Sequence, residues 1–117
     1  MQSSLENFHA YQKAKELFDR VVEDLTPLND IPMCWKLISQ QIASADSIAA
    51  NIEEGFGRET PKDYRHFLVM ARGSARETRG RYERFKHWLP VETIEDRLAH
   101  CDHIIGILTN VINGMKP

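Results

Sequence analysis

The sequence has little of what marks a secreted, metal-stabilised or membrane protein. Its 117 residues contain two cysteines, Cys34 and Cys101, which are too far apart for a Cys-x-x-Cys zinc knuckle or a disulfide-dense scaffold. No apolar run approaches the roughly 18 residues of a membrane-spanning helix, and no basic-then-apolar leader opens the chain. We therefore expect a protein of the reducing cytoplasm without a membrane partner, in which both cysteines are small buried apolar residues.

Strand signals and an excess of one charge are also missing. No run alternates between apolar and polar residues over the length of a strand, and no Asn-Gly or Asp-Gly turn separates two apolar runs. The 15 Lys and Arg residues nearly balance the 17 Asp and Glu residues, which excludes a basic coat for nucleic acid. With 42% hydrophobic residues, one globular domain over residues 1–117 is expected, and it needs no metal or cofactor to fold.

The sequence does contain apolar residues at three- and four-residue steps in four segments. The first runs from residue 4 to about 25, before the turn that begins at Thr26. The second opens at Pro32 and closes at glycines 55 and 57. The third follows the capping pair Thr60-Pro61 to about residue 88, and the fourth follows Pro90 to about residue 114. Helices of this length with short connections predict an all-α, antiparallel up-down-up-down four-helix bundle.

The same spacing predicts which side of each helix faces the core. In the third segment the predicted line is Tyr64, Phe67, Leu68, Ala71, Ala75, Thr78, Tyr82, Phe85 and Leu89. In the second it is Trp35, Ile38, Ile42, Ala45, Ala49 and Ile52, and in the fourth Ile94, Leu98, Cys101, Ile105, Leu108 and Ile112.

Basic residues concentrate in the third segment. Residues 58–87 hold 9 Lys and Arg against 4 Asp and Glu, whereas residues 1–57 hold 4 against 9. Arg65, Arg72, Arg76 and Arg79 share a sector of the helix, called the arginine stripe below, and Arg58 precedes it. The stripe is a candidate nucleic-acid interface along a phosphate backbone; the alternative is pairing with acidic residues of the first half, within or between subunits. Few aromatic residues lie outside the core lines, so no base-stacking platform is predicted.

Small residues dominate the middle of the second segment. Six of the eight residues from Ala43 to Ala50 are Ala or Ser. A polar line that includes Ser47, Asn51 and Glu54 lies opposite the predicted apolar line. This suggests that both sides of the helix are packed, rather than one side facing the core and the other facing solvent. Two interpretations are open: an interface with another copy, or close helix contact inside the bundle.

Two patterns raise the question of catalysis or metal binding. Asp96, His100 and His103 share a helix face, but the glutamate partners of a di-iron bundle are missing, so we interpret these histidines as surface residues and predict no metal site. Arg81 with His87, and Arg97 with His103, have the Arg-x(4–6)-His spacing of HEPN helical ribonucleases. Such spacings arise readily by chance in an arginine-rich chain. A non-enzymatic protein is therefore our prediction, and a HEPN-like ribonuclease is the alternative.

One stretch resembles a known family. Residues 47–58 read SIAANIEEGFGR, followed by YRHFL at 64–68 and ARGSARE at 71–77. This order resembles the four-helix-bundle proteins encoded in 23S rRNA intervening sequences, across the second and third segments. The resemblance implies a homo-oligomer, typically a pentameric ring, without known catalytic activity. Relatives that serve as accessory variability determinants of diversity-generating retroelements bind nucleic acid and associate with a reverse transcriptase. This chain departs from the family pattern at two places. It lacks the arginines that often precede the Ser-Ile element, and it has Glu53 where the family usually has alanine.

The signature residues have physical roles that concern folding and assembly more than catalysis. Gly55 is expected in a left-handed conformation past the second helix. Asn51 and Glu54 are expected to tie the loop at Arg58, or Arg72, to that helix. Gly73 and Ser74 would allow another helix to approach, and Glu77 would pair with Arg81. The residues predicted for oligomer contact or fold signature are Ser47, Asn51, Glu54, Gly55, Gly73, Ser74 and Glu77.

Overall fold

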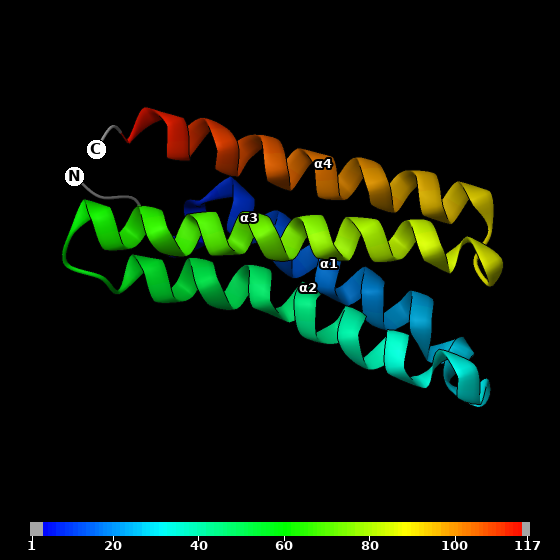
Figure 1. Ribbon diagram of the computed structural model, residues 1–117. Helices are drawn as coiled ribbons and strands as arrows, with labels where there is room; N and C mark the ends of the chain where they lie inside the picture. The colour runs from blue at the N-terminus through cyan, green and yellow to red at the C-terminus, as the bar shows by residue number, and fades with distance from the viewer. Residues whose placement is uncertain (1–3, 116–117) are drawn as a thin grey trace.

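The computed structural model describes residues 4–115 and contains four α-helices. They are α1 (His9–Leu25), α2 (Trp35–Phe56), α3 (Pro61–Arg84) and α4 (Val91–Gly114). In Figure 1 the helices lie side by side, with α3 in front between α2 and α4 and with α1 behind. Successive helices run in opposite directions, and the described residues contain no strand. The predicted all-α four-helix bundle is therefore confirmed.

Local sequence explains where α3 and α4 begin. The side-chain Oγ1 of Thr60 accepts a hydrogen bond from the backbone N–H of Asp63 at 3.2 Å, and Pro61 takes the first helical position. Pro90 is extended and precedes the first residue of α4. The connections between α2, α3 and α4 are short, so these three helices are antiparallel neighbours.

Several predicted helix ends are short 3-10 turns instead. Leu5–Asn7 forms one such turn and Phe8 is extended, so α1 begins at His9 rather than near residue 4. Thr26–Asp30 forms a second turn, where the sequence predicts one, and Pro32–Cys34 forms a third, which delays the start of α2 from Pro32 to Trp35. A proline begins or nearly begins each of these last two turns, where its missing N–H breaks no hydrogen bond. Phe85–His87 forms a fourth turn at the end of α3.

The predicted core lines of α2 and α4 are correct in part: Ala45, Ala49 and Ile52 of α2, and Ile94, Cys101, Leu108 and Ile112 of α4, are buried as predicted. Ile48 is fully buried, whereas Trp35 is 57% exposed. Because α2 packs against both α1 and α3, its buried sector lies between them and includes Gln41, Ser44, Ala45, Ile48, Ala49, Ile52 and Gly55. On α4, Ile104 is fully buried and Ile105 only partly. The core line of α3 is correct from Leu68 to Phe85, while its ends are only partly buried.

Gly55 has a different role from the predicted one. It lies inside the last turn of α2, and no residue between 4 and 115 has a positive φ. A Cβ at position 55 would lie 3.1 Å from both Phe67 Cβ and Tyr64 Cδ1. Glycine therefore serves the close crossing of α3 over α2, where a side chain would force Phe67 or Tyr64 to shift, rather than a left-handed turn. A Cβ at Gly73, in contrast, would have no neighbour within 4 Å, so this glycine serves no close approach inside the subunit.

The small residues of α2 serve two surfaces. Ser44 and Ala45 are buried inside the bundle, which matches the interpretation of close contact between helices. Ala43 and Ala50 are exposed, and Ser47 is half-buried. The outward half of the small-residue segment thus has no partner within the described subunit.

Candidate nucleic-acid interface

Two arginines of the stripe reach from α3 to α4 without meeting an acidic side chain. Arg65 Nε donates to the carbonyl of Ile112 at 3.4 Å, and Arg72 Nη1 donates to Thr109 Oγ1 at 3.2 Å. Both arginines are half-buried, and the buried Nε of Arg72 has no hydrogen-bond partner among residues 4–115. Residues 103–115 of the α4 region include no Asp or Glu. No carboxylate of α4 therefore balances these two guanidinium charges.

The remaining two stripe arginines differ from one another. Arg79 donates to both carboxylate oxygens of Asp102, at 2.6 and 3.2 Å, and also pairs with Glu83. The hydrogen bond to Asp102 raises the pKa of Arg79. Arg76 is exposed and forms no hydrogen bond or ion pair within the described part of the chain. The acidic partners within the chain thus come from α3 and α4, so the predicted pairing with the first half of the same subunit is wrong.

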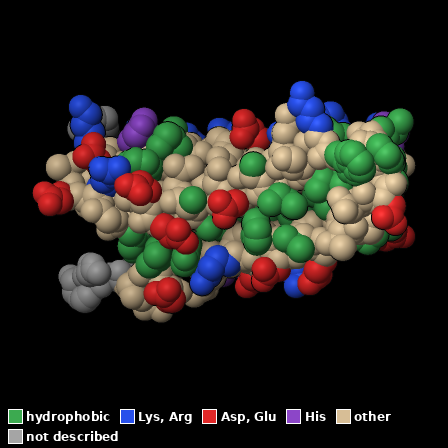
Figure 2. Space-filling view, turned by 90° about the horizontal axis from the view of Figure 1, so that it is seen from below, with side chains coloured by type: hydrophobic (Ala, Val, Ile, Leu, Met, Phe, Trp, Pro, Cys, Tyr) green, Lys and Arg blue, Asp and Glu red, His purple; other side chains and the backbone are tan. Residues whose placement is uncertain are grey.

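Acidic side chains are exposed on the face that α2 forms. Figure 2 views the bundle from the α2 side and shows red acidic side chains spread across this face. Exposed examples on α2 are Asp46, Glu53 and Glu54. Exposed carboxylates also occur on α3 and α4, for example Asp63, Glu77 and Asp102, so acidic side chains are not confined to this face.

The fifth candidate arginine, Arg58, is engaged at the corner between α2 and α3. Its Nη2 lies 2.6 Å from Glu54 Oε2, and its guanidinium lies 4.7 Å from the ring centre of Phe67. Glu54 therefore ties the loop to α2 as predicted. Asn51 instead donates to the Ser47 carbonyl of its own helix, and neither Asn51 nor Glu54 reaches Arg72.

Arg81 turns toward α2 rather than toward Glu77. Its Nη1 donates to Gln41 Oε1 at 2.8 Å and to Ser44 Oγ at 3.0 Å. The Ser44 hydroxyl also lies 2.8 Å from Thr78 Oγ1, within a buried polar layer between the two helices. Burial lowers the pKa of Arg81, because these neutral partners do not replace a carboxylate. The predicted Glu77–Arg81 pair does not form.

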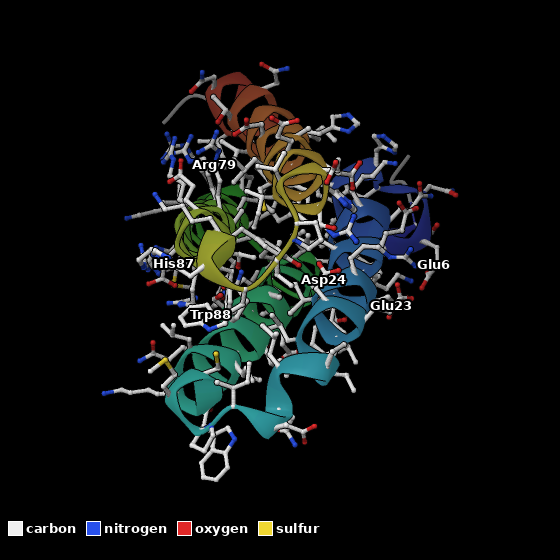
Figure 3. All side chains as sticks on the ribbon, turned by 90° about the vertical axis from the view of Figure 1, so that its right-hand side faces the viewer. Glu6, Glu23, Asp24, Arg79, His87 and Trp88 are labelled. Atoms are coloured by element: carbon white, nitrogen blue, oxygen red, sulfur yellow. The ribbon has the colours of Figure 1, made fainter. Side chains whose placement is uncertain are left out.

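Sequence reasoning missed the most buried ion pair. Arg97 Nε and Nη2 donate to the two carboxylate oxygens of Asp24 at 2.8 and 2.9 Å, across the seam between α1 and α4. Tyr82 Oη donates to the same carboxylate at 2.7 Å, and Asp96 also pairs with Arg97. The hydrogen bonds to Asp24 raise the pKa of Arg97, while burial raises that of Tyr82. Figure 3 shows Asp24 pointing into the bundle, whereas its neighbour Glu23 points outward.

The two Arg-x(4–6)-His pairs do not form a visible catalytic pair. Arg97 is committed to Asp24, while the exposed His103 stacks edge-on against His9 with ring centres 5.2 Å apart. Arg81 is held in the α2–α3 layer, while His87 is exposed at the end of the bundle (Figure 3).

The predicted histidine face likewise has ordinary structural contacts. His100 Nε2 lies 3.0 Å from the Lys13 carbonyl, and burial lowers the pKa of His100. Within residues 4–115, no group of three or more His, Cys, Asp and Glu side chains is placed to hold a metal ion. No helix in this range has the length and apolar content to cross a bilayer.

Both cysteines are fully buried and unpaired, as predicted for small apolar residues. Burial raises the pKa of the Cys101 thiol to about 12, so the unreactive protonated form prevails at neutral pH.

Comparison with known proteins identifies the family. The family model described as "23S rRNA-intervening sequence protein" matches residues 6–110 of this chain. The chain belongs to this family. The match covers most of all four helices, so the resemblance predicted from residues 47–77 is confirmed and extends over the bundle.

A solved structure shares the fold of this family member. It is a protein of unknown function from the S23 ribosomal protein family of Bacteroides thetaiotaomicron, 24% identical in sequence, with a TM-score of 0.82. The similarity covers 88% of this chain and 97% of the other. No match to a curated protein was found. The family and the fold are therefore established, and the role of the arginine stripe must be argued from its own chemistry.

Proposed function

We propose that this protein is a non-enzymatic, self-associating four-helix bundle of the cytoplasm that binds RNA or DNA as an accessory factor. The observation that carries the proposal is the charge of Arg65, Arg72 and Arg76, which no described carboxylate neutralises. Guanidinium groups bind phosphate oxygens strongly, and phosphate contacts supply most sequence-independent affinity for nucleic acid. Residues 65–76 of α3 span about 16 Å, which is enough for a few nucleotides.

Self-association is supported by the outward half of the small-residue segment. Ala43 and Ala50 on α2, and Gly73 on α3, are exposed and lack bulky side chains. Small residues allow a helix of another copy to approach closely. The family resemblance implies a ring of five subunits and, as a protein partner, a nucleic-acid enzyme such as a reverse transcriptase.

The non-enzymatic part of the proposal is supported by the roles of Arg81 and Arg97. Each is held by side chains that stabilise contacts between helices, so neither is available to a scissile phosphate beside its histidine. Labelled RNA should remain intact during incubation with the protein. Cleavage that disappears in His87→Ala or His103→Ala would contradict this and favour a HEPN-like ribonuclease.

The binding proposal is tested with the double variant Arg72→Glu plus Arg76→Glu. On a single strand, each phosphate contact contributes about 0.7 to the slope of log K against log salt. Loss of two contacts should therefore lower affinity about 25-fold at 0.1 M salt. The measurement is fluorescence anisotropy of a labelled single-stranded RNA. Arg20→Glu plus Lys36→Glu is the matched control, because it changes the net charge equally on α1 and α2. Equal affinities for the two variants would rule out the stripe as the binding surface.

The assembly proposal is tested by native mass spectrometry. The wild-type protein should form a multimer, and Ala50→Arg should reduce it to monomers by placing a large charged side chain in the interface. Ala99→Arg, at an exposed position of α4, should keep the wild-type mass. A wild-type monomer at micromolar concentration would show that the outward small residues are not an interface.

A further inference from the structure

A pocket with aromatic walls lies at the corner where α2 connects to α3. It has a volume of about 590 Å³. Phe8, Phe56 and Tyr64 line it and are all half-buried, and the ring centres of Phe56 lie 5.7 Å from Phe8 and 5.4 Å from Tyr64. The polar side chains of Asn7 and Glu59 also line it. The pocket therefore combines flat apolar surfaces with hydrogen-bonding groups.

Three features of the fold create this pocket. The α1 helix begins only at His9, so it has 17 residues against 22 and 24 in α2 and α3. Extended Phe8 then brings its ring to the corner instead of continuing the helix. Gly55 lets α3 cross close to α2, which brings Tyr64 beside Phe56.

The pocket adjoins Arg65, the first of the three unneutralised arginines of the stripe. Met115 lines the pocket, and its backbone N–H donates to the Ile112 carbonyl at 3.1 Å. The same carbonyl accepts the hydrogen bond from Arg65 Nε at 3.4 Å. The next residue along the chain from Arg65 toward the corner is Tyr64, which lines the pocket. A phosphate bound at Arg65 would thus lie beside the pocket wall.

We propose that this pocket holds one unstacked base of a single-stranded nucleic acid whose phosphates contact Arg65, Arg72 and Arg76; this inference rests on the proposed function. The rings of Phe56 and Tyr64 offer stacking surfaces to a base of any identity. Asn7 and Glu59 supply hydrogen-bonding groups that can meet the polar edge of a base. Arg58 also lines the pocket, but it is paired with Glu54, so the adjacent phosphate is assigned to Arg65.

The experiment compares two probes on the full chain. One is an eight-nucleotide RNA, and the other is an abasic strand with the same number of phosphates. Wild-type protein should bind the RNA about tenfold more tightly, because stacking of one base on an aromatic side chain contributes on that order. Phe56→Leu should remove this preference and leave affinity for the abasic strand unchanged. Trp35→Leu is the matched control, because it removes an exposed aromatic ring away from the pocket.

A second readout does not depend on the stripe. Adenosine monophosphate at millimolar concentration should shift the ring proton signals of Phe56 and Tyr64 in NMR spectra. The shifts should persist in Arg72→Glu plus Arg76→Glu, since a mononucleotide contacts Arg65 alone. This readout also covers the case in which Phe56→Leu fails to fold.

The outcomes separate this inference from the proposed function. If wild-type protein binds neither strand, the stripe proposal fails. The NMR shifts with adenosine monophosphate then determine by themselves whether the pocket binds a base. If it binds both strands equally, or if Phe56→Leu keeps the preference for RNA, the base pocket is overturned while phosphate binding stands. Absence of ring shifts with the mononucleotide would likewise overturn the pocket.

Discussion

The α1–α4 seam and the N-terminal half of α3 against α4 use arginine in opposite ways, while farther along α3 Arg79 pairs with Asp102. Against α1, Arg97 meets the carboxylate of Asp24, with 15% and 8% of these side chains exposed. Against α3, Arg65 and Arg72 meet only a carbonyl and a hydroxyl. The first arrangement uses the positive charge inside the fold, whereas the second leaves it for an outside partner.

The difference shows that a basic stripe in a sequence does not by itself indicate binding. Each arginine must be assigned by its acceptor, because a carboxylate neutralises the charge and a neutral acceptor only positions it. By this criterion the charge of Arg79 is used in the fold, whereas Arg65, Arg72 and Arg76 keep an unneutralised charge. Arg81 also lacks a carboxylate, but Gln41 and Ser44 hold it in the buried layer between α2 and α3, away from the stripe.

Removing the carboxylate of the α1–α4 seam should have the largest effect. Asp24→Ala leaves Arg97 without its main acid and Tyr82 without an acceptor, so the free energy of unfolding should fall by about 3–5 kcal/mol. Urea denaturation followed by circular dichroism measures this. Glu23→Ala is the control, because Glu23 is exposed and its ion pair with Arg20 is solvated; its effect should stay below about 1 kcal/mol. Similar losses for both variants would contradict the assignment of Asp24 to the fold.

Adding a carboxylate beside Arg72 should make this part of the α3–α4 seam resemble the α1–α4 seam. Thr109→Asp places an acid where Arg72 now meets a hydroxyl, and the loss of one phosphate contact should weaken RNA binding about fivefold at 0.1 M salt. Stability should change by less than about 1 kcal/mol. Ser39→Asp on α2 adds the same charge at an exposed position and should weaken binding less. Unchanged RNA affinity in Thr109→Asp would remove Arg72 from the binding surface.

The smallest effect concerns His100 on the α1–α4 seam. Its pKa in the folded protein is lowered from 6.5 by burial, so the unfolded chain binds its proton more readily. The stability that this group contributes is complete above pH 6.5 and is lost as pH falls through the lowered pKa. His100→Gln, which can still donate to the Lys13 carbonyl, should flatten the pH dependence of unfolding in this range. An identical pH profile in the variant would contradict this role.

The bundle itself was predictable because its signals are local. Apolar spacing within each helix, the cap at Thr60 and the stop at Pro90 depend on neighbours in the sequence. The exact start of α1 was not predictable, because Phe8 leaves the helix to pack against Phe56. The role of Gly55 was missed for a similar reason, since its close contacts come from α3.

The candidate site was predictable only in part. Periodicity placed the stripe arginines in one sector, but the acceptor of each lies on another helix. Asp24 and Arg97 are 73 residues apart, and no spacing rule connects them. The aromatic pocket combines the rings of Phe8, Phe56 and Tyr64, which come from three different segments of the chain. The sequence had placed Phe8 in the first predicted helix and Tyr64 in the third. Contacts of this kind arise from tertiary packing, which a single sequence does not encode at a fixed spacing.

The most direct test of the account is the salt dependence of affinity for an eight-nucleotide RNA. Three phosphate contacts from Arg65, Arg72 and Arg76 predict that log K falls with log salt at a slope of about -2, and that the double variant Arg72→Glu plus Arg76→Glu reduces this slope by about 1.4. A slope near zero in the wild-type protein, or the same slope in both proteins, would contradict the claim that these charges serve an outside partner.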